Sequence, residues 1–217
     1  MKIEISNILS KGIDTIVFDL GGVIIDVNIE ESLKAFAALN ITNLSYKDIV
    51  AENEPIFREL ELGLITPNEF IDKFHILFPA SKSIPADSIW TAWNACLQPY
   101  INSRIALIKE LKPYFNIYLL SNTNLPHRIV FKRMFQEQFG YELESLFIEC
   151  FYSDELHLRK PDPEIYNQVT DKINTKPEKI LFIDDNATNI AQAKLCGWNI
   201  YHLTDGETIT DIFNFTE

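Results

Sequence analysis

Short apolar runs alternate along this chain with longer segments of helical periodicity. Five runs are rich in β-branched and other apolar residues, as buried strands are, and they lie at residues 15–19, 117–121, 147–152, 180–184 and 199–203. Apolar residues at helical spacing fill the intervals at residues 126–140, 162–173 and 187–197. Strands separated by helices of this length need crossover connections. The sequence therefore predicts an α/β fold with a Rossmann-like parallel sheet.

One interval breaks this alternation. Residues 28–99 show helical signals and no convincing strand, with candidate helices at residues 32–39, 46–62, 67–78 and 87–97. We therefore expect a core domain made of residues 1–27 and 100–217, with residues 28–99 inserted as a helical cap domain after the first strand. Insertions at the carboxyl end of a strand lie over the ligand crevice of an open α/β sheet, which favours a lid over extra helices packed along the sheet.

The charge balance limits the partners of this protein. Its 217 residues carry 19 basic and 31 acidic side chains, a net charge of −12. Nucleic acids and anionic membranes both require a basic surface, so neither is expected as a main partner. A small anionic substrate, held by a few local cations and a metal, remains compatible with this charge.

Cysteine usage and hydropathy indicate the compartment. Cys96, Cys150 and Cys196 are odd in number and lack the spacing of a metal site or a disulfide framework, which is typical of free thiols in a reducing compartment. No run approaches 18 uncharged apolar residues, and the first residues do not resemble a signal peptide. We expect a cytoplasmic protein that is a monomer or a weak dimer.

Asp19 is the most informative single residue. It ends the first apolar run and is followed directly by Leu20-Gly21-Gly22. A carboxylate at the end of a buried strand is costly to desolvate unless a metal or hydrogen bonds compensate. The two glycines let the backbone turn sharply and approach a ligand closely. By itself the pattern fits a loop cap equally well.

Three further polar segments fall at comparable places. They are Ser121-Asn122-Thr123-Asn124 after the second strand, Arg159-Lys160-Pro161-Asp162-Pro163 before a helix, and Asp184-Asp185-Asn186 with Asn189 one helical turn later. Each has a structural explanation when taken alone: a strand end, a surface lysine and a helix cap. Because the carboxyl ends of parallel strands open onto one edge, the sheet would gather all of these groups there.

This set of groups suits phosphoryl transfer. A hard cation such as Mg²⁺, with Mn²⁺ as an alternative, takes one or two carboxylates and keeps waters and phosphate oxygens. Asp19, Asp185 and the Gly21 carbonyl would hold it. Asp184, with Asn189 nearby, would orient the waters of the metal from behind.

The phosphate would be held by other groups at the same edge. Lys160, Ser121 and the amide of Asn122 would bind its oxygens and balance the charge that develops on them. Asp19 would then attack phosphorus, giving an aspartyl-phosphate that water hydrolyses.

The chain resembles the haloacid dehalogenase superfamily, with its four motifs in order. They stand as Phe18-Asp19-Leu20-Gly21-Gly22-Val23, Leu120-Ser121-Asn122-Thr123-Asn124, Lys160-Pro161-Asp162-Pro163-Glu164-Ile165-Tyr166 and Phe182-Ile183-Asp184-Asp185-Asn186. Within the superfamily the chain is most similar to the bacterial α-D-glucose-1-phosphate phosphatase group. The resemblance implies a metal-dependent phosphatase of a small phosphomonoester, with Asp19 as nucleophile and metal ligand, Asp185 as metal ligand, and Ser121, Asn122 and Lys160 as phosphate binders.

One position departs from this pattern. Most phosphatases of the superfamily carry an aspartate at the position of Gly21, which protonates the leaving oxygen and later activates water. General acid–base help is worth roughly 10²–10⁴-fold, so its loss would slow the enzyme without abolishing catalysis. An anomeric sugar phosphate such as glucose 1-phosphate needs this proton less. Asp26 is a candidate substitute, although a structural role at the entrance to the cap is favoured.

The missing carboxyl keeps other functions open. The main alternative is a catalytically weak or silent protein that binds phosphate and metal. A phosphoglucomutase and a dehalogenase are less favoured. Substrate choice would lie in the cap, where Arg58, His75, Trp93 and Asn94 are candidates for facing the crevice.

Overall fold

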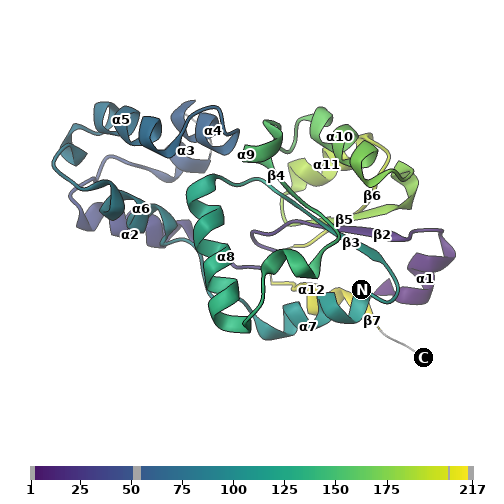
Figure 1. The fold of residues 1–217 in the computed structure, drawn as a ribbon. Coiled ribbons are helices and arrows are strands. Elements are labelled where there is room, and N and C mark those ends of the chain that lie inside the picture. The colour runs from purple at the N-terminus through teal and green to yellow at the C-terminus, as the bar shows by residue number, and fades with distance from the viewer. Residues whose placement is uncertain (1–2, 51–54, 205, 215–217) are drawn as a thin grey trace.

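The computed structural model describes residues 3–50, 55–204 and 206–214. Its centre is a five-stranded parallel sheet in the order β4-β3-β2-β5-β6 (Figure 1). The strands are β2 (Thr15–Phe18), β3 (Asn116–Ser121), β4 (Cys150–Tyr152), β5 (Ile180–Asp184) and β6 (Asn199–His202). The predicted Rossmann-like parallel sheet is confirmed.

The register of the central strands decides which residues meet at the carboxyl edge. Phe18 pairs with Leu119 of β3 and with Ile183 of β5. The N–H of Asp19 then donates to the carbonyl of Ile183 at 2.9 Å. The residues that follow these paired positions, among them Asp184, therefore emerge side by side.

Helices cover both faces of the sheet because side chains alternate along each strand. In β2, Ile16 and Phe18 join one hydrophobic cluster and Val17 joins another, and all three are fully buried. The first cluster is covered by α1 (Ile5–Ser10), α7 (Asn102–Leu111), α8 (Leu125–Phe139) and α12 (Ile209–Ile212). The second lies under α10 (Pro163–Ile173) and α11 (Ala187–Leu195), above the sheet in Figure 1.

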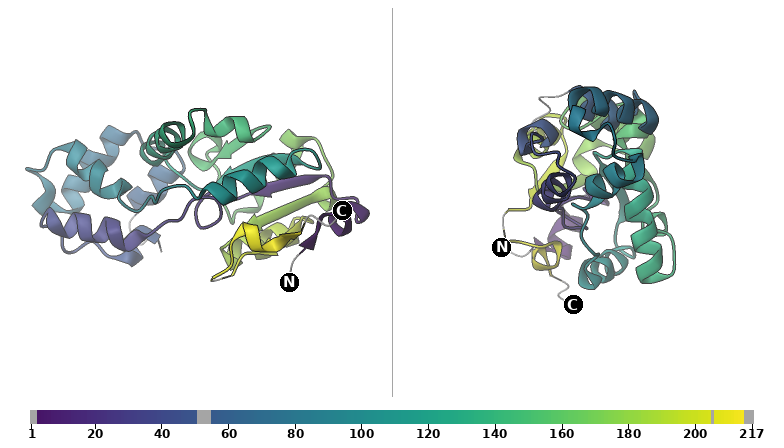
Figure 2. Two further views of the ribbon diagram at one scale, coloured as in Figure 1. Left: turned by 90° about the horizontal axis from the view of Figure 1, so that it is seen from below. Right: turned by 90° about the vertical axis from the view of Figure 1, so that its left-hand side faces the viewer.

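The helices between β2 and α7 form a lobe of their own. It contains α2 (Ile29–Ala38), α3 (Tyr46–Val50), α4 (Pro55–Glu61), α5 (Pro67–Leu77), the 3₁₀ turn η1 (Pro79–Ser81) and α6 (Ala86–Asn94). Phe36, Phe70 and Phe74 are at most 1% exposed at the centre of a third hydrophobic cluster that lies entirely within this lobe. The lobe lies to the left of the sheet in Figure 1 and in the left panel of Figure 2, beyond α8. A separate apolar centre lets these helices pack on one another instead of along the sheet.

Some predicted boundaries differ from those of the structure. Of the helix expected over residues 46–62, the structure describes α3 and α4, and residues 51–54 between them lie outside the described part of the chain. The strand expected from residue 147 begins only at Cys150, and the 3₁₀ turn η2 (Leu143–Leu146) precedes it. Asp162 is the N-cap residue of α10, but its side chain makes no capping hydrogen bond.

Other elements gave no clear sequence signal. The helix α7, the short helices α9 (Ser153–Leu156) and α12, and the 3₁₀ turn η3 (Pro177–Lys179) were not predicted. Nor was a second, two-stranded parallel sheet between β1 (Ile3–Glu4) and β7 (Phe213–Asn214), which joins the two ends of the described chain. None of the helices within the described ranges combines the length and apolar character that a membrane crossing requires.

Candidate active site

Three carboxylates meet at the carboxyl edge of the sheet, as predicted. Asp19 follows β2, and Asp184 and Asp185 come at the end of β5 and just after it. One oxygen of each lies within 4.8 Å of an oxygen of the other two. Asp184 is fully buried, Asp19 is 9% exposed, and Asp185 is the most accessible.

Lys160 lies directly among these carboxylates. Its Nζ is 2.8 Å from Asp19 Oδ1 and 2.7 Å from Asp184 Oδ2. The same ammonium donates to the carbonyl of Leu120 at 3.0 Å and is only 1% exposed as a residue. Burial favours the neutral amine, but Asp184 and Asp19 outweigh it and raise the pKa of Lys160. Lys160 is therefore a buried cation, and a solvated surface lysine is excluded.

The side chain of Asn122 holds the lysine loop in place. Its Nδ2 donates to the carbonyl of Lys160 at 2.8 Å, and the N–H of Lys160 donates back to Asn122 Oδ1 at 2.9 Å. The side-chain amide thus positions Lys160, which leaves the backbone N–H of Asn122 as the group suited to a phosphate oxygen. The neighbouring Ser121 is 3% exposed, and its hydroxyl makes a long contact of 3.4 Å with the carbonyl of Asn122.

Asp184 is fixed by a set of donors. Asn189 Nδ2 lies 3.2 and 3.1 Å from its two oxygens, and the N–H of Asn186 donates to it at 2.7 Å. Together with Lys160, these contacts occupy the carboxylate, so Asp184 positions the lysine. Asn186 also caps α11 by accepting from the N–H groups of Thr188 and Asn189, which bears out the helix-cap interpretation of this residue.

The electrostatics of the cluster favour a cation. Burial raises the pKa of Asp19 to about 7, with Lys160 opposing and Asp184 and Asp185 adding to the rise. Partial desolvation, and then the negative charge of Asp184, raise the pKa of Asp185 as well. Carboxylates crowded in this way are the donor set of Mg²⁺, so the residues present fit such an ion.

Gly22 allows the carboxylate of Asp185 to lie against the backbone. Its φ is +71°, and a Cβ there would come within 2.1 Å of Asp185 Oδ2. Gly21 has no such φ, and a Cβ would meet Val27 Cγ2 at 3.3 Å. The second glycine of the pair is therefore the one that the acidic cluster requires.

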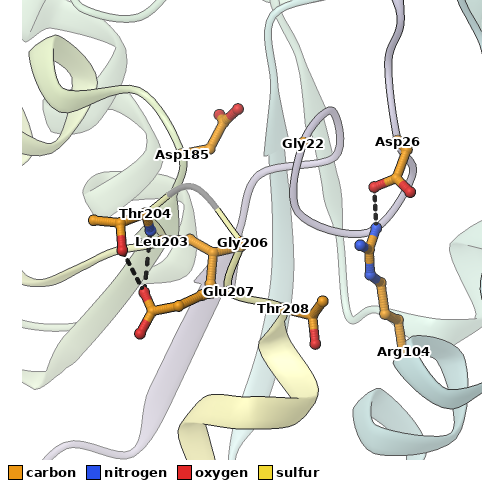
Figure 3. A pocket seen from close by; sticks show the side chains of 9 residues that line it. All are labelled: Gly22, Asp26, Arg104, Asp185, Leu203, Thr204, Gly206, Glu207 and Thr208. Atoms are coloured by element: carbon orange, nitrogen blue, oxygen red, sulfur yellow. Dashed lines mark hydrogen bonds and ion pairs between the residues drawn. The ribbon is translucent and has the colours of Figure 1, made fainter. Parts of the chain in front are cut away.

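Asp26 has a structural partner. Its Oδ1 lies 2.6 Å from Nη1 of Arg104, a residue of α7 that is 5% exposed (Figure 3). Both line a pocket of about 310 Å³ next to Gly22 and Asp185, closed on the other side by residues including Thr204 and Glu207. The ion pair ties the loop after β2 to α7, which favours the structural role expected for Asp26 over that of an acid.

A second pocket, of about 260 Å³, lies where the helical lobe meets the sheet edge. Its lining comes from both sides: Ile29, Phe57, Glu61 and Trp93 from the lobe, and Asn122, Thr123, Asn124, His127, Arg159 and Asn186 from the core. The rings of Phe57 and Trp93 stack at 5.3 Å, and those of Trp93 and His127 at 5.0 Å. The lining of this interface pocket therefore combines a stack of aromatic rings with several polar side chains.

The four candidates from the lobe have different places. Trp93 lines the interface pocket as expected, whereas Asn94 contacts a lining residue, with its Oδ1 2.8 Å from His127 Nδ1. Arg58 is half exposed and 3.9 Å from Asp162, and His75 contacts Ser81 within the lobe. Of the four, the structure places only Trp93 in the wall of this pocket.

Sequence reasoning missed Glu61 and did not single out Arg159 for a role. Oε1 of Glu61, the last residue of α4, lies 2.7 Å from Nε of Arg159, the residue before Lys160. The available signal was Gly63, whose φ is +63° and whose Cβ would lie 2.1 Å from the carbonyl oxygen of Asp154. That glycine marks a close approach of lobe and core, but the sequence does not say to what.

Comparison with known proteins gives a consistent result. The sequence profile of the haloacid dehalogenase-like hydrolases matches residues 13–197. The structure resembles a haloacid dehalogenase family enzyme of Bacteroides thetaiotaomicron in complex with magnesium and inorganic phosphate, with a TM-score of 0.87, 30% identity, and coverage of 92% of this chain and 98% of the other. A predicted hydrolase from Porphyromonas gingivalis has a TM-score of 0.80 at 30% identity, covering 90% and 93% of the two chains.

Two named phosphatases are similar along most of their length. A D-ribitol-5-phosphate phosphatase of Bacteroides thetaiotaomicron is 28% identical, covering 89% of this chain and 93% of its own. A sesquiterpene phosphatase of Aspergillus oryzae is 29% identical, covering 87% and 89%. The profile match extends over most of the chain and includes all four motifs. The chain therefore belongs to the haloacid dehalogenase-like hydrolases and is an enzyme of that family.

Proposed function

We propose that this enzyme is a metal-dependent phosphatase that hydrolyses small phosphomonoesters through an aspartyl-phosphate on Asp19. The observation that carries the proposal is the contact of Asp19 with the buried ammonium of Lys160 at 2.8 Å, beside Asp184 and Asp185. A carboxylate nucleophile, a fixed cation and a second acidic ligand are the parts that phosphoryl transfer to an aspartate needs. The names of the two similar phosphatases support the same reaction class.

The metal would be held by Asp19, Asp185 and the carbonyl of Gly21. Mg²⁺ is the ion in the similar Bacteroides structure, and Mn²⁺ would fit the same oxygen ligands. When bound, the ion supplies positive charge to the phosphoryl oxygens and allows an anionic Asp19 to approach them. Ser121, the backbone N–H of Asn122 and Lys160 would bind the other phosphate oxygens.

The residues of the chain then divide the work. Lys160 neutralises the charge that develops on the phosphoryl oxygens, and Asp184, Asn189 and Asn122 keep it in place. A carboxylate oxygen of Asp19 attacks phosphorus, the bond to the leaving oxygen breaks, and water later cleaves the aspartyl-phosphate. Residues 28–99 would act as the cap domain that closes over the ester and excludes bulk water.

The substrate we favour is a sugar or polyol phosphate. The lining of the interface pocket combines the stacked rings of Phe57, Trp93 and His127 with polar groups such as Asn122, a composition that suits a compact polyhydroxylated group. Similar proteins are named for ribitol 5-phosphate and for phosphorylated carbohydrates. Glucose 1-phosphate remains our candidate from the sequence. A cytoplasmic location and a monomer or weak dimer also stay predictions.

A metal-dependent assay on p-nitrophenyl phosphate tests the proposal, since this leaving group needs no proton. We expect turnover that requires Mg²⁺ and is lost in Asp19→Asn. The matched control is Asp14→Asn at the opposite end of the same strand, where the half-exposed carboxylate pairs with Lys179 and turnover should persist. A folded protein without phosphatase activity would instead support the silent binding protein.

A substrate panel then sets the class. We expect ribitol 5-phosphate or glucose 1-phosphate to be hydrolysed with a higher kcat/KM than a terpenyl monophosphate. The reverse order would contradict a polyol or sugar substrate. Retention of the phosphoryl group on Asp19 and its return to the sugar would point to a phosphoglucomutase.

A further inference from the structure

The leaving oxygen of an alcohol needs a proton, and Gly21 has no side chain to supply one. Asp184 is engaged with Lys160. In the proposed function, Asp19 is the nucleophile and Asp185 is a metal ligand, so neither is available as the acid. Asp26 pairs with Arg104 and lines the other pocket. Within the described residues, Glu61 is the one carboxyl in the lining of the interface pocket.

The end of α4 is docked firmly on the core. The carbonyl of Glu61 accepts a hydrogen bond from Ser153 Oγ at 2.8 Å, and the next carbonyl, of Leu62, lies 2.8 Å from His157 Nδ1. Gly63 follows, with its backbone against the carbonyl of Asp154. Three successive residues thus anchor the lobe to the segment that follows β4. The backbone that carries the Glu61 side chain is thereby held at the junction.

The carboxyl itself lies in the wall of the interface pocket, which Asn122 also lines. Its Oε1 is buried and lies 2.7 Å from Nε of Arg159, next to Lys160 in the chain. A quarter of the side chain remains exposed, and that part belongs to atoms other than Oε1. Glu61 therefore has one buried carboxyl oxygen and still lines the interface pocket in which a substrate would lie.

We propose that Glu61 donates the proton to the leaving oxygen and then accepts one from the attacking water, in place of the carboxyl that is missing at Gly21. The inference rests on the proposed phosphatase function. Glu61 belongs to the lobe and not to the loop after β2. The acid would therefore be at the site only when the lobe and the core are in contact.

The two steps balance in protons. In the first, an Asp19 oxygen bonds to phosphorus, the bond from phosphorus to the leaving oxygen breaks, and the proton of the Glu61 carboxylic acid moves to that oxygen. In the second, water bonds to phosphorus, its proton moves to the Glu61 carboxylate, and the bond to Asp19 breaks. Glu61 ends protonated, ready for the next ester.

The charged surroundings of Glu61 are compatible with both protonation states. Burial raises the pKa of Glu61 to about 7; Lys160 opposes the rise, Asp19 adds to it, Arg58 opposes it and Asp154 adds to it. Arg159 also faces this carboxyl, with Nε 2.7 Å from Oε1, and its positive charge favours the carboxylate form. A group that ionises near neutral pH is suited to general acid–base catalysis.

A merely structural Glu61 would instead hold the lobe closed through Arg159. Two variants separate these roles, Glu61→Gln and Arg159→Gln, because both break the ion pair but only the first removes the acid. Rapid-quench formation of the aspartyl-phosphate is measured with p-nitrophenyl phosphate and with the best sugar or polyol phosphate. Circular dichroism and thermal unfolding check that each variant folds.

For Glu61→Gln we expect the burst rate with the sugar or polyol ester to fall by roughly 10²–10⁴-fold, and with p-nitrophenyl phosphate far less. Steady-state turnover should fall for both esters, because water attack loses its base, and the pH limb near 7 should disappear. Arg159→Gln should slow both esters by a similar factor. Equal effects of Glu61→Gln on both burst rates, or none, would overturn the role of Glu61.

The wild-type enzyme keeps the two hypotheses apart. If it does not form an aspartyl-phosphate from p-nitrophenyl phosphate, the phosphatase function itself is wrong. If it does, and Glu61→Gln behaves like Arg159→Gln, only the proton-transfer role fails.

Discussion

Replacing Gly22 by alanine tests how the acidic cluster is built. The residue has a φ of +71°, which an L side chain adopts at a cost of about 1–2 kcal/mol. For a chain of this length that cost corresponds to a fall in Tm of about 2–8 °C. In addition, the new Cβ would come within 2.1 Å of Asp185 Oδ2. The carboxylate is the end of a movable side chain, so it would swing away rather than unfold the loop.

The expected defect is therefore in metal binding more than in stability. Moving a ligand off its position should weaken Mg²⁺ binding by roughly 10–100-fold, in the range found when the support of a metal ligand is removed. Isothermal titration with Mg²⁺ measures the affinity directly. The Mg²⁺ dependence of p-nitrophenyl phosphate hydrolysis gives a second value.

Gly140→Ala provides the matched control. Gly140 ends α8 with a φ of +79°, and a Cβ there would meet no described residue beyond its neighbours in the chain within 4 Å. It shares the backbone cost and lacks the contact with Asp185. We expect both variants to lose similar stability and only Gly22→Ala to lose Mg²⁺ affinity. If the two variants bind Mg²⁺ equally well, the contact with the Asp185 carboxylate is not the reason that position 22 requires a glycine.

Three further predictions concern stability. Asp184→Asn weakens the buried pair with Lys160 and should lower the free energy of unfolding in urea by about 3–5 kcal/mol. Asp185→Asn changes an exposed carboxylate and should cost little, so equal losses in the two variants would contradict the buried pair. Burial lowers the pKa of His127 to about 3, below the ordinary 6.5 of the unfolded chain. The unfolded chain therefore takes up the proton first, so the contribution of His127 to the free energy of unfolding is present above pH 6.5 and is lost on acidification. It should amount to about 2 kcal/mol between pH 7 and pH 5, and a His127→Gln variant with the same pH dependence as wild type would count against it. Phe70→Ala empties a fully buried site in the lobe and should cost about 3–5 kcal/mol by chemical denaturation; a loss below about 1 kcal/mol would show that the lobe has no fixed core.

The sequence alone determined the sheet and the residues at its edge. Uninterrupted apolar runs mark strands buried on both faces, and a parallel sheet brings their carboxyl ends to one side whatever the details of packing. For this reason Asp19, Lys160 and Asp185 could be assigned to one site before any coordinates. Residues with strong local preferences also predicted where some helices end, as at Gly140, which follows the last residue of α8.

Only the tertiary structure decided what surrounds those residues. The roles of Asn122 in holding Lys160, of Gly22 in admitting Asp185, and of Arg104 in pairing with Asp26 depend on contacts between segments far apart in the chain. Glu61 is the strongest case, since its neighbour Arg159 belongs to a distant part of the sequence and no local pattern announces the pair. Periodicity and spacing report on one segment at a time, whereas the position of a side chain across an interface depends on how two packed bodies meet.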